Sequence, residues 1–260
     1  MRKIFCCLTA AVLLLGAVGC AAPTSAEEPE ATPQETSAAA ESSPEGAILF
    51  DDAALEGYVR EAIGKPTGEI TVADARLVTE LELSQQGVDP NQPYIHRLDA
   101  LRYFTNLTYL GLGYAVQNEE DATAPVDITP LAGLTKLQSL QMGGVVIGDL
   151  SALSGMKDLM SLSVFNGGQP LDLSPLAGLT NLQALTLRNN RITDVSPLSG
   201  LTHLIYLDLE GNQIADVSPL AGLTGLTRLF LSGNPITDYS PLTEVRSDLE
   251  EWDFEAQAKP

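Results

Sequence analysis

The chain has 260 residues, of which 44% are hydrophobic and only 5% aromatic, and its formal net charge is −20. A surface this acidic repels phosphate groups, so the composition argues against nucleic acid as a partner and against broad electrostatic adsorption to anionic lipid. All three cysteines, Cys6, Cys7 and Cys20, lie near the N-terminus. The rest of the chain can therefore form no internal disulfide and no cysteine zinc site.

Residues 1–19 are predicted to be a secretion signal. Arg2 and Lys3 precede a mostly apolar run over residues 4–18, which is short for a membrane span. The run ends in Ala17-Val18-Gly19-Cys20, which resembles a bacterial lipobox, the motif whose cysteine becomes the lipidated first residue of the mature protein. The resemblance implies a diacylglycerol on Cys20 and an extracytoplasmic protein anchored to the cell membrane. The alternative is an ordinary signal peptide with an accidental cysteine.

The segment at 20–47 is rich in Ala, Pro, Glu, Ser and Thr and contains almost no large apolar side chains. Such a segment cannot bury enough surface to offset its chain entropy, so we expect a disordered tether. A coil of about 27 residues has a typical end-to-end distance of roughly 25–30 Å, which would lift the domain that follows off a membrane.

Residues 48–79 are predicted to form a helical cap on the N-terminal end of that domain. Asp51 or Asp52 can N-cap the first helix, and Thr71 with Asp74 has capping-box spacing for a second, short helix. The apolar face of the first helix is expected to comprise Leu55, Tyr58, Val59, Ala62 and Ile63. A repeat array needs such a cap because its first repeat would otherwise expose an apolar end.

A 22-residue repeat organises the remainder of the chain. Between Leu176 and Leu242, three consecutive units carry the pattern L-x-x-L-x-L-x-x-N-x-I, and this period is typical of a leucine-rich-repeat solenoid, an α/β fold. We expect residues 80–255 to form a right-handed array of about eight rungs, followed by a tail at 256–260. The parallel β-sheet should line the concave face, with short 3₁₀ or helical turns on the convex face. Strands are expected at the L-x-L pairs 81–83, 110–112, 140–142, 162–164, 185–187, 207–209 and 229–231, and at Trp252-x-Phe254.

Two intervals between rungs are longer than the repeat, at 29 and 30 residues. The extra residues fall in 87–97 and 114–124. The second insertion is acidic, with Glu119, Glu120 and Asp121, and is expected to project as a loop.

Asparagine, aspartate and serine recur with the repeat. Asn190, Asn212 and Asn234 follow successive strands, where a buried amide can satisfy backbone groups of its own turn and of the adjacent one. A ladder of aspartates consists of Asp149, Asp172, Asp194, Asp216 and Asp238. We expect each to accept local backbone N–H bonds in an Asx-type turn, although stacked carboxylates here or in the acidic loop could also bind calcium. N-cap positions are then predicted for Ser174, Ser196, Ser218 and Ser240, each followed by proline.

The sequence shows no catalytic arrangement. His96 and His203 are expected to be solvated, and neither has a partner at metal-ligand or triad spacing. There is no G-x-S-x-G, no H-E-x-x-H and no phosphate-binding loop. We therefore predict a protein that is not an enzyme and that holds no cofactor and no metal.

Alternate residues of each predicted strand face solvent on the concave side of the sheet. Aromatic and arginine side chains stand out among them, because these types dominate interface energetics and the repeat itself does not require them. The candidate ligand-binding residues are Tyr109, Gln141, Phe165, Arg188, Tyr206, Asp208, Arg228 and Phe230. The alternative is that such side chains only satisfy one another, through cation–π contacts and ion pairs such as those of Arg228 with Tyr206 and Glu251.

Residues from about 50 to 255 resemble the internalin-type leucine-rich-repeat proteins of bacterial surfaces. The resemblance rests on the 22-residue period, the three full repeat units, the D-x-S-P-L-x-x-L connectors and the helical cap. It implies protein recognition on the concave face, the face with which internalins bind host receptors. We therefore predict a monomeric, lipid-anchored adhesion or recognition module that binds a protein, from a host or from the same cell. The alternative is a structural or scaffolding lipoprotein of the envelope with a partner in the same cell.

Overall fold

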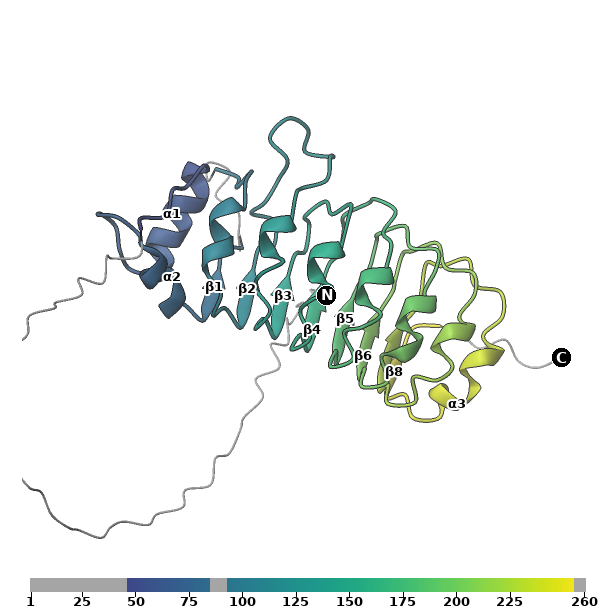
Figure 1. Cartoon of the computed structure of the whole chain (residues 1–260). Helices are drawn as coiled ribbons and strands as arrows, with labels where there is room; N and C mark the ends of the chain where they lie inside the picture. Colours follow the sequence, from purple (N-terminus) through teal and green to yellow (C-terminus); the bar gives the residue numbers. More distant parts are fainter. Residues whose placement is uncertain (1–45, 85–92, 255–260) are drawn as a thin grey trace, which may run out of the picture. The chain divides into compact units, whose positions relative to one another are not determined.

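The computed structural model describes residues 46–84 and 93–254 of the chain. Eight short strands of this part form one parallel sheet, in which every strand pairs with its neighbours in the sequence. The strands are β1 (Glu80–Glu82), β2 (Tyr109–Gly111), β3 (Ser139–Gln141), β4 (Ser161–Ser163), β5 (Ala184–Thr186), β6 (Tyr206–Asp208), β7 (Arg228–Phe230) and β8 (Glu251–Trp252). Figure 1 shows them side by side, with helical turns on the opposite side of the array. This is the leucine-rich-repeat solenoid that the sequence predicts.

Each strand is centred on the first residue of its L-x-L pair, so the strands begin one residue earlier than predicted. Leu110 of β2 lies opposite Leu140 of β3, and the same register continues through β7. The central leucines are buried, while the residues before and after them face the open side of the sheet. The columns of solvent-facing residues expected from the sequence are therefore the observed register pairs.

The core consists of leucine columns that run the length of the array. In one repeat, Leu176, Leu179, Leu182 and Leu185 are all fully buried. Burying a leucine side chain contributes about 1.5–3 kcal/mol, whereas each ordered backbone residue costs roughly 1–2 kcal/mol. The burial free energy of a single repeat is thus smaller than the entropy cost of ordering its backbone. Its stability therefore depends on the rungs stacked on either side.

Short 3₁₀ turns cover the convex side. They are η1 (Asp99–Tyr103), η2 (Thr129–Leu131), η3 (Ser151–Leu153), η4 (Ser174–Leu176), η5 (Ser196–Gly200), η6 (Ser218–Leu220) and η7 (Ser240–Leu242). Each contributes a leucine to the core, such as the buried Leu198 of η5. The turns thereby close the hydrophobic layer opposite the sheet.

The aspartate ladder caps these turns, and the prediction of serine N-caps is wrong. Asp172 Oδ1 accepts the backbone N–H of Ser174 at 2.9 Å, and the Ser174 hydroxyl donates to the same oxygen at 2.7 Å. Ser174 is the first residue of η4 and Leu173 is its N-cap. The carboxylate already satisfies the exposed N–H of the first turn, so the serine side chain supports the aspartate. The same backbone bond recurs in the other four repeats of the ladder.

Two helices cover the N-terminal end of the array, α1 (Ala53–Ala62) and α2 (Val72–Leu77). Asp52 is the N-cap of α1, and Thr71 with Asp74 forms a reciprocal capping box at α2, as expected. Leu55 and Val59 of α1 are buried against the first rung. Ala62, which was expected on the same apolar face, is exposed because it lies in the last turn of the helix.

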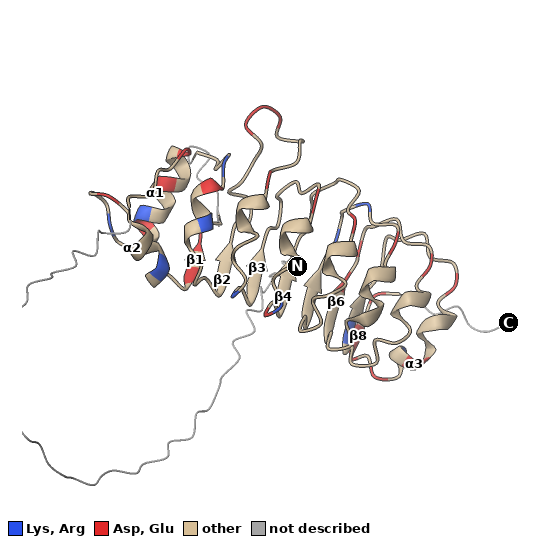
Figure 2. Cartoon of the chain, viewed as in Figure 1, with Lys and Arg blue, Asp and Glu red and all other residues tan. Residues whose placement is uncertain are grey.

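The two insertions contact each other beside the sheet. Ile95 of the first pairs with Val116 of the second, through bonds from Ile95 N to Ala115 O at 2.8 Å and from Gln117 N to Ile95 O at 2.9 Å. The acidic loop at 114–124 projects from the array between β2 and β3 (Figure 1) and its tip carries acidic residues (Figure 2). His96 was expected to be solvated, but it is partly buried and its Nδ1 lies 2.9 Å from the Gln117 carbonyl.

The last rung departs from the repeat. Trp252 occupies the position of an inward leucine, but it is 42% exposed, and among the described residues no rung lies beyond β8 to cover it. Its ring lies under the guanidinium of Arg246, 5.6 Å away, at the end of α3 (Thr243–Arg246). Phe254 does turn inward and stacks on Tyr239 at 5.0 Å.

The predicted signal peptide, Cys20, nearly all of the predicted tether and the tail at 256–260 lie outside the described residues. Within the described residues, the helices are too short and too polar for a span across a bilayer.

Candidate functional site

Three side chains of β6 and β7 lie together on the open face of the sheet. Register pairing sets Tyr206 beside Arg228 and Asp208 beside Phe230. The rings of Tyr206 and Phe230 are in contact, with centroids 5.7 Å apart and planes inclined by 51°. Tyr206, Arg228 and Phe230 are all half-buried, and we call them the sheet patch.

Arg228 is only loosely paired. Its Nε lies 3.8 Å from Oε2 of Glu251, and both side chains are well exposed. An exposed ion pair at that distance contributes about 0–1 kcal/mol. Of the alternative in which Arg228 is satisfied by its neighbours, the ion pair with Glu251 is present, while the Tyr206 ring contacts Phe230. The Arg228 guanidinium is therefore available to an acceptor on a partner.

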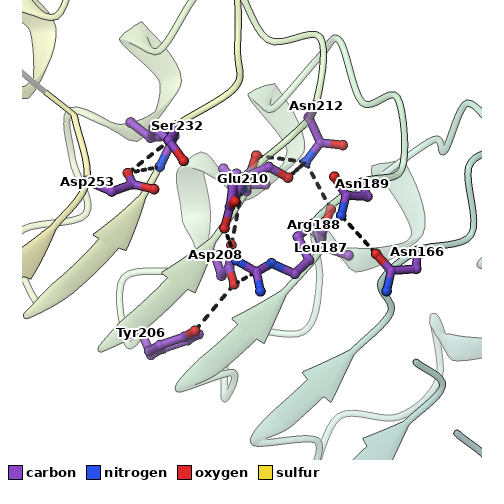
Figure 3. A network of polar contacts seen from close by, with 12 residues as sticks. Asn166, Leu187, Arg188, Asn189, Tyr206, Asp208, Glu210, Asn212, Ser232 and Asp253 are labelled. Atoms are coloured by element: carbon purple, nitrogen blue, oxygen red, sulfur yellow. Dashed lines mark hydrogen bonds and ion pairs between the residues drawn. The ribbon is translucent and has the colours of Figure 1, made fainter. Parts of the chain in front are cut away.

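Arg188 of the neighbouring rung is held by two carboxylates (Figure 3). Its Nε lies 3.2 Å from Oδ2 of Asp208 and its Nη2 contacts Oε2 of Glu210. The Nε–H is buried without an aligned hydrogen-bond acceptor, so the contact with Asp208 is one of charge. The two carboxylates neutralise the Arg188 guanidinium. Arg188 therefore lies next to the sheet patch but is not counted as part of it.

Asp208 was a candidate for direct ligand contact, but it is buried beneath its neighbours. Burial raises its pKa, and the nearby Arg188 charge partly opposes that shift. The Tyr206 hydroxyl donates to Asp208 Oδ2 at 3.4 Å, and the Glu210 N–H donates to Oδ1 at 3.1 Å. Burial likewise raises the pKa of Tyr206, so the phenol stays protonated and the patch presents one net positive group. Asp208 thus positions Tyr206 and Arg188.

Two other candidates lie apart from the sheet patch. Tyr109 is on β2 and donates its hydroxyl to Glu82 Oε2 at 2.5 Å, and burial together with that carboxylate raises its pKa strongly. Gln141 is exposed on β3. With strands about 4.8 Å apart, β2 lies roughly 24 Å from β7. The eight candidate residues therefore do not form a single site.

Phe165 joins a row of side chains that the sequence analysis missed. Its ring meets Tyr114 edge-on at 6.3 Å, and Asn166 donates from Nδ2 to the Tyr114 hydroxyl at 3.3 Å. Tyr114 has a φ of 58°, at a position where the next five rungs also have positive φ and carry Gly144, Asn166, Asn189, Gly211 and Gly233. A tyrosine at a position where the next five rungs carry only glycine or asparagine was the signal available in the sequence.

Metal binding finds no support among the described residues, where no group of three or more His, Asp or Glu side chains is arranged to hold an ion. Hydrogen bonds to local N–H groups lower the pKa of Asp172, Asp216 and Asp238, as expected for carboxylates engaged in turns. His203 is exposed, with its Nδ1 2.8 Å from the Thr180 carbonyl.

Comparisons with known proteins agree with this architecture. A family model described as leucine-rich repeats in two copies matches residues 180–222 and 202–244. The structure is similar to that of internalin C2 from Listeria monocytogenes, with 29% sequence identity, a TM-score of 0.58, and coverage of 79% of this chain and 94% of that one. It is also similar to the internalin inlF of the same organism, with 29% identity and a TM-score of 0.59 over 80% of this chain and 63% of that one. A search of curated proteins finds no match.

The fold and these similarities support a leucine-rich-repeat solenoid that resembles the internalins in architecture. Arrays of this kind typically serve as protein-interaction modules. Which surface binds, and what it binds, depends on the side chains described above.

Proposed function

We propose that the protein is a lipid-anchored, extracytoplasmic adhesion or recognition module that binds a protein ligand through the sheet patch on its concave face. The observation that carries the proposal is the contact of Tyr206 with Phe230 next to a loosely paired Arg228. Tyrosine and arginine are the types most enriched among residues that dominate binding energy. The two rings support each other, so little side-chain freedom remains to be lost on binding.

The chemistry of the patch favours a partner surface that combines an apolar contact with a carboxylate. The Phe230 and Tyr206 rings offer the apolar area, and the Arg228 guanidinium can hold a carboxylate with two parallel hydrogen bonds. Neighbouring Arg188 is already neutralised by Asp208 and Glu210, so it adds little net charge. The patch is small, and flanking rungs would supply the rest of an interface of ordinary size.

The anchor is a separate prediction. We expect Cys20 to be the first residue of the mature protein and to carry two acyl chains, since two chains suffice for stable anchoring and one does not. Intact-mass analysis of the native protein from membranes measures this directly. A mature protein with an unmodified cysteine, or with residues 1–19 retained, contradicts the anchor while leaving the binding proposal untouched.

A pull-down with quantitative mass spectrometry tests the binding proposal. The full chain is compared with Arg228→Ala/Phe230→Ala, using extracts of candidate host cells and envelope extracts of the producing cell. The proposal predicts at least one surface protein that the full chain retains and the double variant loses. Retention from host extract only supports an adhesin, and retention from envelope extract only supports a scaffold. If every retained protein is held equally by both baits, the sheet patch does not bind.

A further inference from the structure

A pocket of about 440 Å³ lies on the flank of the array, where the acidic loop folds over the ends of β2 and β3. Its walls are mainly aromatic and aliphatic, and they include Tyr94, Tyr114, Val116, Ala122, Val126 and Val146. We call it the flank pocket. Gln117 and Asn118 add two polar side chains to the lining. Tyr94 and Tyr114 are 43% and 48% exposed, so both residues are accessible to solvent.

Hydrogen bonds hold the loop that supplies Gln117, Asn118 and Ala122 to the lining of the pocket. Asn118 Oδ1 accepts the N–H groups of Glu120 and Asp121, and Asp121 Oδ1 accepts that of Thr123. The loop is tied to the array at two points, by Val126 N to Val146 O at 2.9 Å and by Gln169 Nε2 to Thr123 O at 3.2 Å. The pocket is thus built before any ligand arrives.

Tyr114 is held in an unfavourable backbone conformation at the edge of the pocket. Its φ of 58° costs of order 1 kcal/mol for a bulky residue. The ring is fixed by Phe165 and Asn166, and it lies over Gly144, where even a Cβ atom would come within 2.2 Å of it. Strain of this kind persists where the surrounding structure requires it and is concentrated at functional sites.

The rim of the pocket is negatively charged. Asn118 and Ala122 line the pocket, and the three residues between them are Glu119, Glu120 and Asp121, all exposed. No described lysine or arginine forms an ion pair with these three carboxylates. Asp121 keeps a lowered pKa through its bonds to Thr123, so it remains charged in mildly acidic conditions.

We propose that the flank pocket binds a lysine or arginine side chain from a basic segment of a partner protein. Both side chains join an apolar stem to a cationic head. The stem would lie against Val116 and Val126, the head would meet the carboxylates at the rim, and the tyrosine faces would add cation–π attraction. An anionic or purely apolar group would leave the three carboxylates without a counterion.

This site differs from the sheet patch in both chemistry and place. The sheet patch offers a cation to a partner, whereas the flank pocket offers anions and aromatic faces. Phe165, which follows β4, contacts Tyr114 at the flank pocket, whereas the sheet patch lies on β6 and β7. The inference does not depend on the proposed function of the sheet patch.

The test uses two labelled peptides, one with two arginines among glycines and one with neutral citrulline in their place. Their affinities for the full chain are measured by fluorescence anisotropy. Because the whole protein is acidic, the decisive comparison is between two triple variants with the same change in net charge. Glu119→Gln/Glu120→Gln/Asp121→Asn alters the rim, and Glu61→Gln/Glu69→Gln/Glu244→Gln alters exposed carboxylates elsewhere.

We expect the rim variant to weaken arginine-peptide binding about tenfold, equivalent to about 1.4 kcal/mol, and the distant variant less than about twofold. Ala122→Trp, which fills the pocket without removing a charge, should weaken it by a similar factor, and Tyr94→Ala should weaken it more modestly. Arg228→Ala/Phe230→Ala should bind the peptide normally. Equal losses in the two triple variants would mean adsorption to the net charge only, and normal binding by Ala122→Trp would mean that the pocket is not used. Either result overturns the proposal.

Discussion

At the scale of single residues, the asparagine column holds consecutive turns together. Asn212 is 4% exposed, and its Oδ1 accepts the N–H groups of Asn190 and Ile192 in the preceding rung. Its Nδ2 donates to the carbonyls of Leu187 and Leu209. One side chain therefore bonds to five backbone groups in two rungs, the fifth being the Glu210 carbonyl at 3.4 Å. Leucine of similar size has no polar atom, and the shorter serine has only one hydroxyl.

We predict that Asn212→Ala lowers the free energy of unfolding by about 1–3 kcal/mol, because it leaves buried backbone groups without partners. Gln141→Ala, on the exposed face of β3, should change it by no more than about 0.5 kcal/mol. Urea denaturation of the two variants measures both values. Equal losses would mean that Asn212 does not serve the inward turn.

A second prediction at this scale concerns acid. Asp74 accepts hydrogen bonds from Lys65 Nζ at 2.7 Å and from Thr71 N at 2.8 Å, and these bonds lower its pKa from 3.8 to about 2. A carboxyl with a lowered folded-state pKa stabilises the protein above its unfolded-state pKa and loses that contribution as the pH falls through the folded-state value. The difference in unfolding free energy between wild type and Asp74→Asn should thus be constant above about pH 4 and shrink toward pH 2. Urea denaturation of both proteins across that pH range measures this difference. If the difference in unfolding free energy is the same at pH 6 and pH 2.5, the pKa of Asp74 is not lowered by these bonds.

At the scale of elements, one buried carboxylate joins the N-terminal cap to the first insertion, in addition to the apolar contacts of α1 with the first rung. Asp52 Oδ1 accepts the N–H of Leu55 at 2.8 Å and so caps α1, while Oδ2 accepts the N–H groups of His96 and Arg97 at 2.7 and 3.1 Å. The side chain is 8% exposed. It therefore ties α1 to the first insertion, 44 residues away in the sequence.

Asp52→Ala should cost about 2–4 kcal/mol of unfolding free energy, since it removes a helix cap and leaves two more N–H groups without an acceptor. Asp52→Ser, which can still cap α1 but cannot reach the insertion, should lose less. Hydrogen exchange at His96 and Arg97 checks the mechanism. Unchanged protection of those two amides in Asp52→Ala would show that the tie is not what orders the insertion.

The elements also show what periodicity can and cannot predict. The rungs, their register and the inward leucines follow from spacing alone, because an alternating strand pattern fixes which side chains face the core. Spacing placed Ser174 at the N-cap, but Ser174 is the first residue of η4 and Leu173 is the N-cap, while Asp172 accepts the free N–H of Ser174 as the sequence suggested. It also misplaced Trp252, since burial at the last rung requires a next rung.

The candidate site was predictable only in part, because the repeat spacing fixes strand register but does not fix side-chain rotamers. The pairing of Tyr206 with Arg228 follows from register, whereas the burial of Asp208 and the preference of the Tyr206 ring for Phe230 depend on rotamers. The flank pocket could not be predicted from the sequence. It arises from contact between two insertions that have no repeat pattern, through pairs such as Ile95 and Val116.

At the scale of the whole molecule, a parallel array of eight strands holds its side chains at fixed spacing along one face. Since β6 and β7 are each hydrogen-bonded to a strand on both sides, the backbone under the sheet patch has little freedom to rearrange on binding. Most of the molecule is strongly acidic, whereas the sheet patch presents a cation beside two aromatic rings. That contrast with its surroundings distinguishes the patch from the rest of the concave face.

The affinity of a captured protein partner for sheet-patch variants tests this account most directly. Arg228→Ala/Phe230→Ala should weaken binding by at least about 2 kcal/mol, roughly thirtyfold, because both side chains contact the partner. The matched control, Lys157→Ala/Leu49→Ala, also removes one cation and one apolar side chain, from exposed positions off the sheet face, and should bind as wild type does. Urea melts establish that both variants are folded. Normal binding by the sheet-patch variant, with a loss in the control, would contradict the account and place recognition on the turns or the acidic loop.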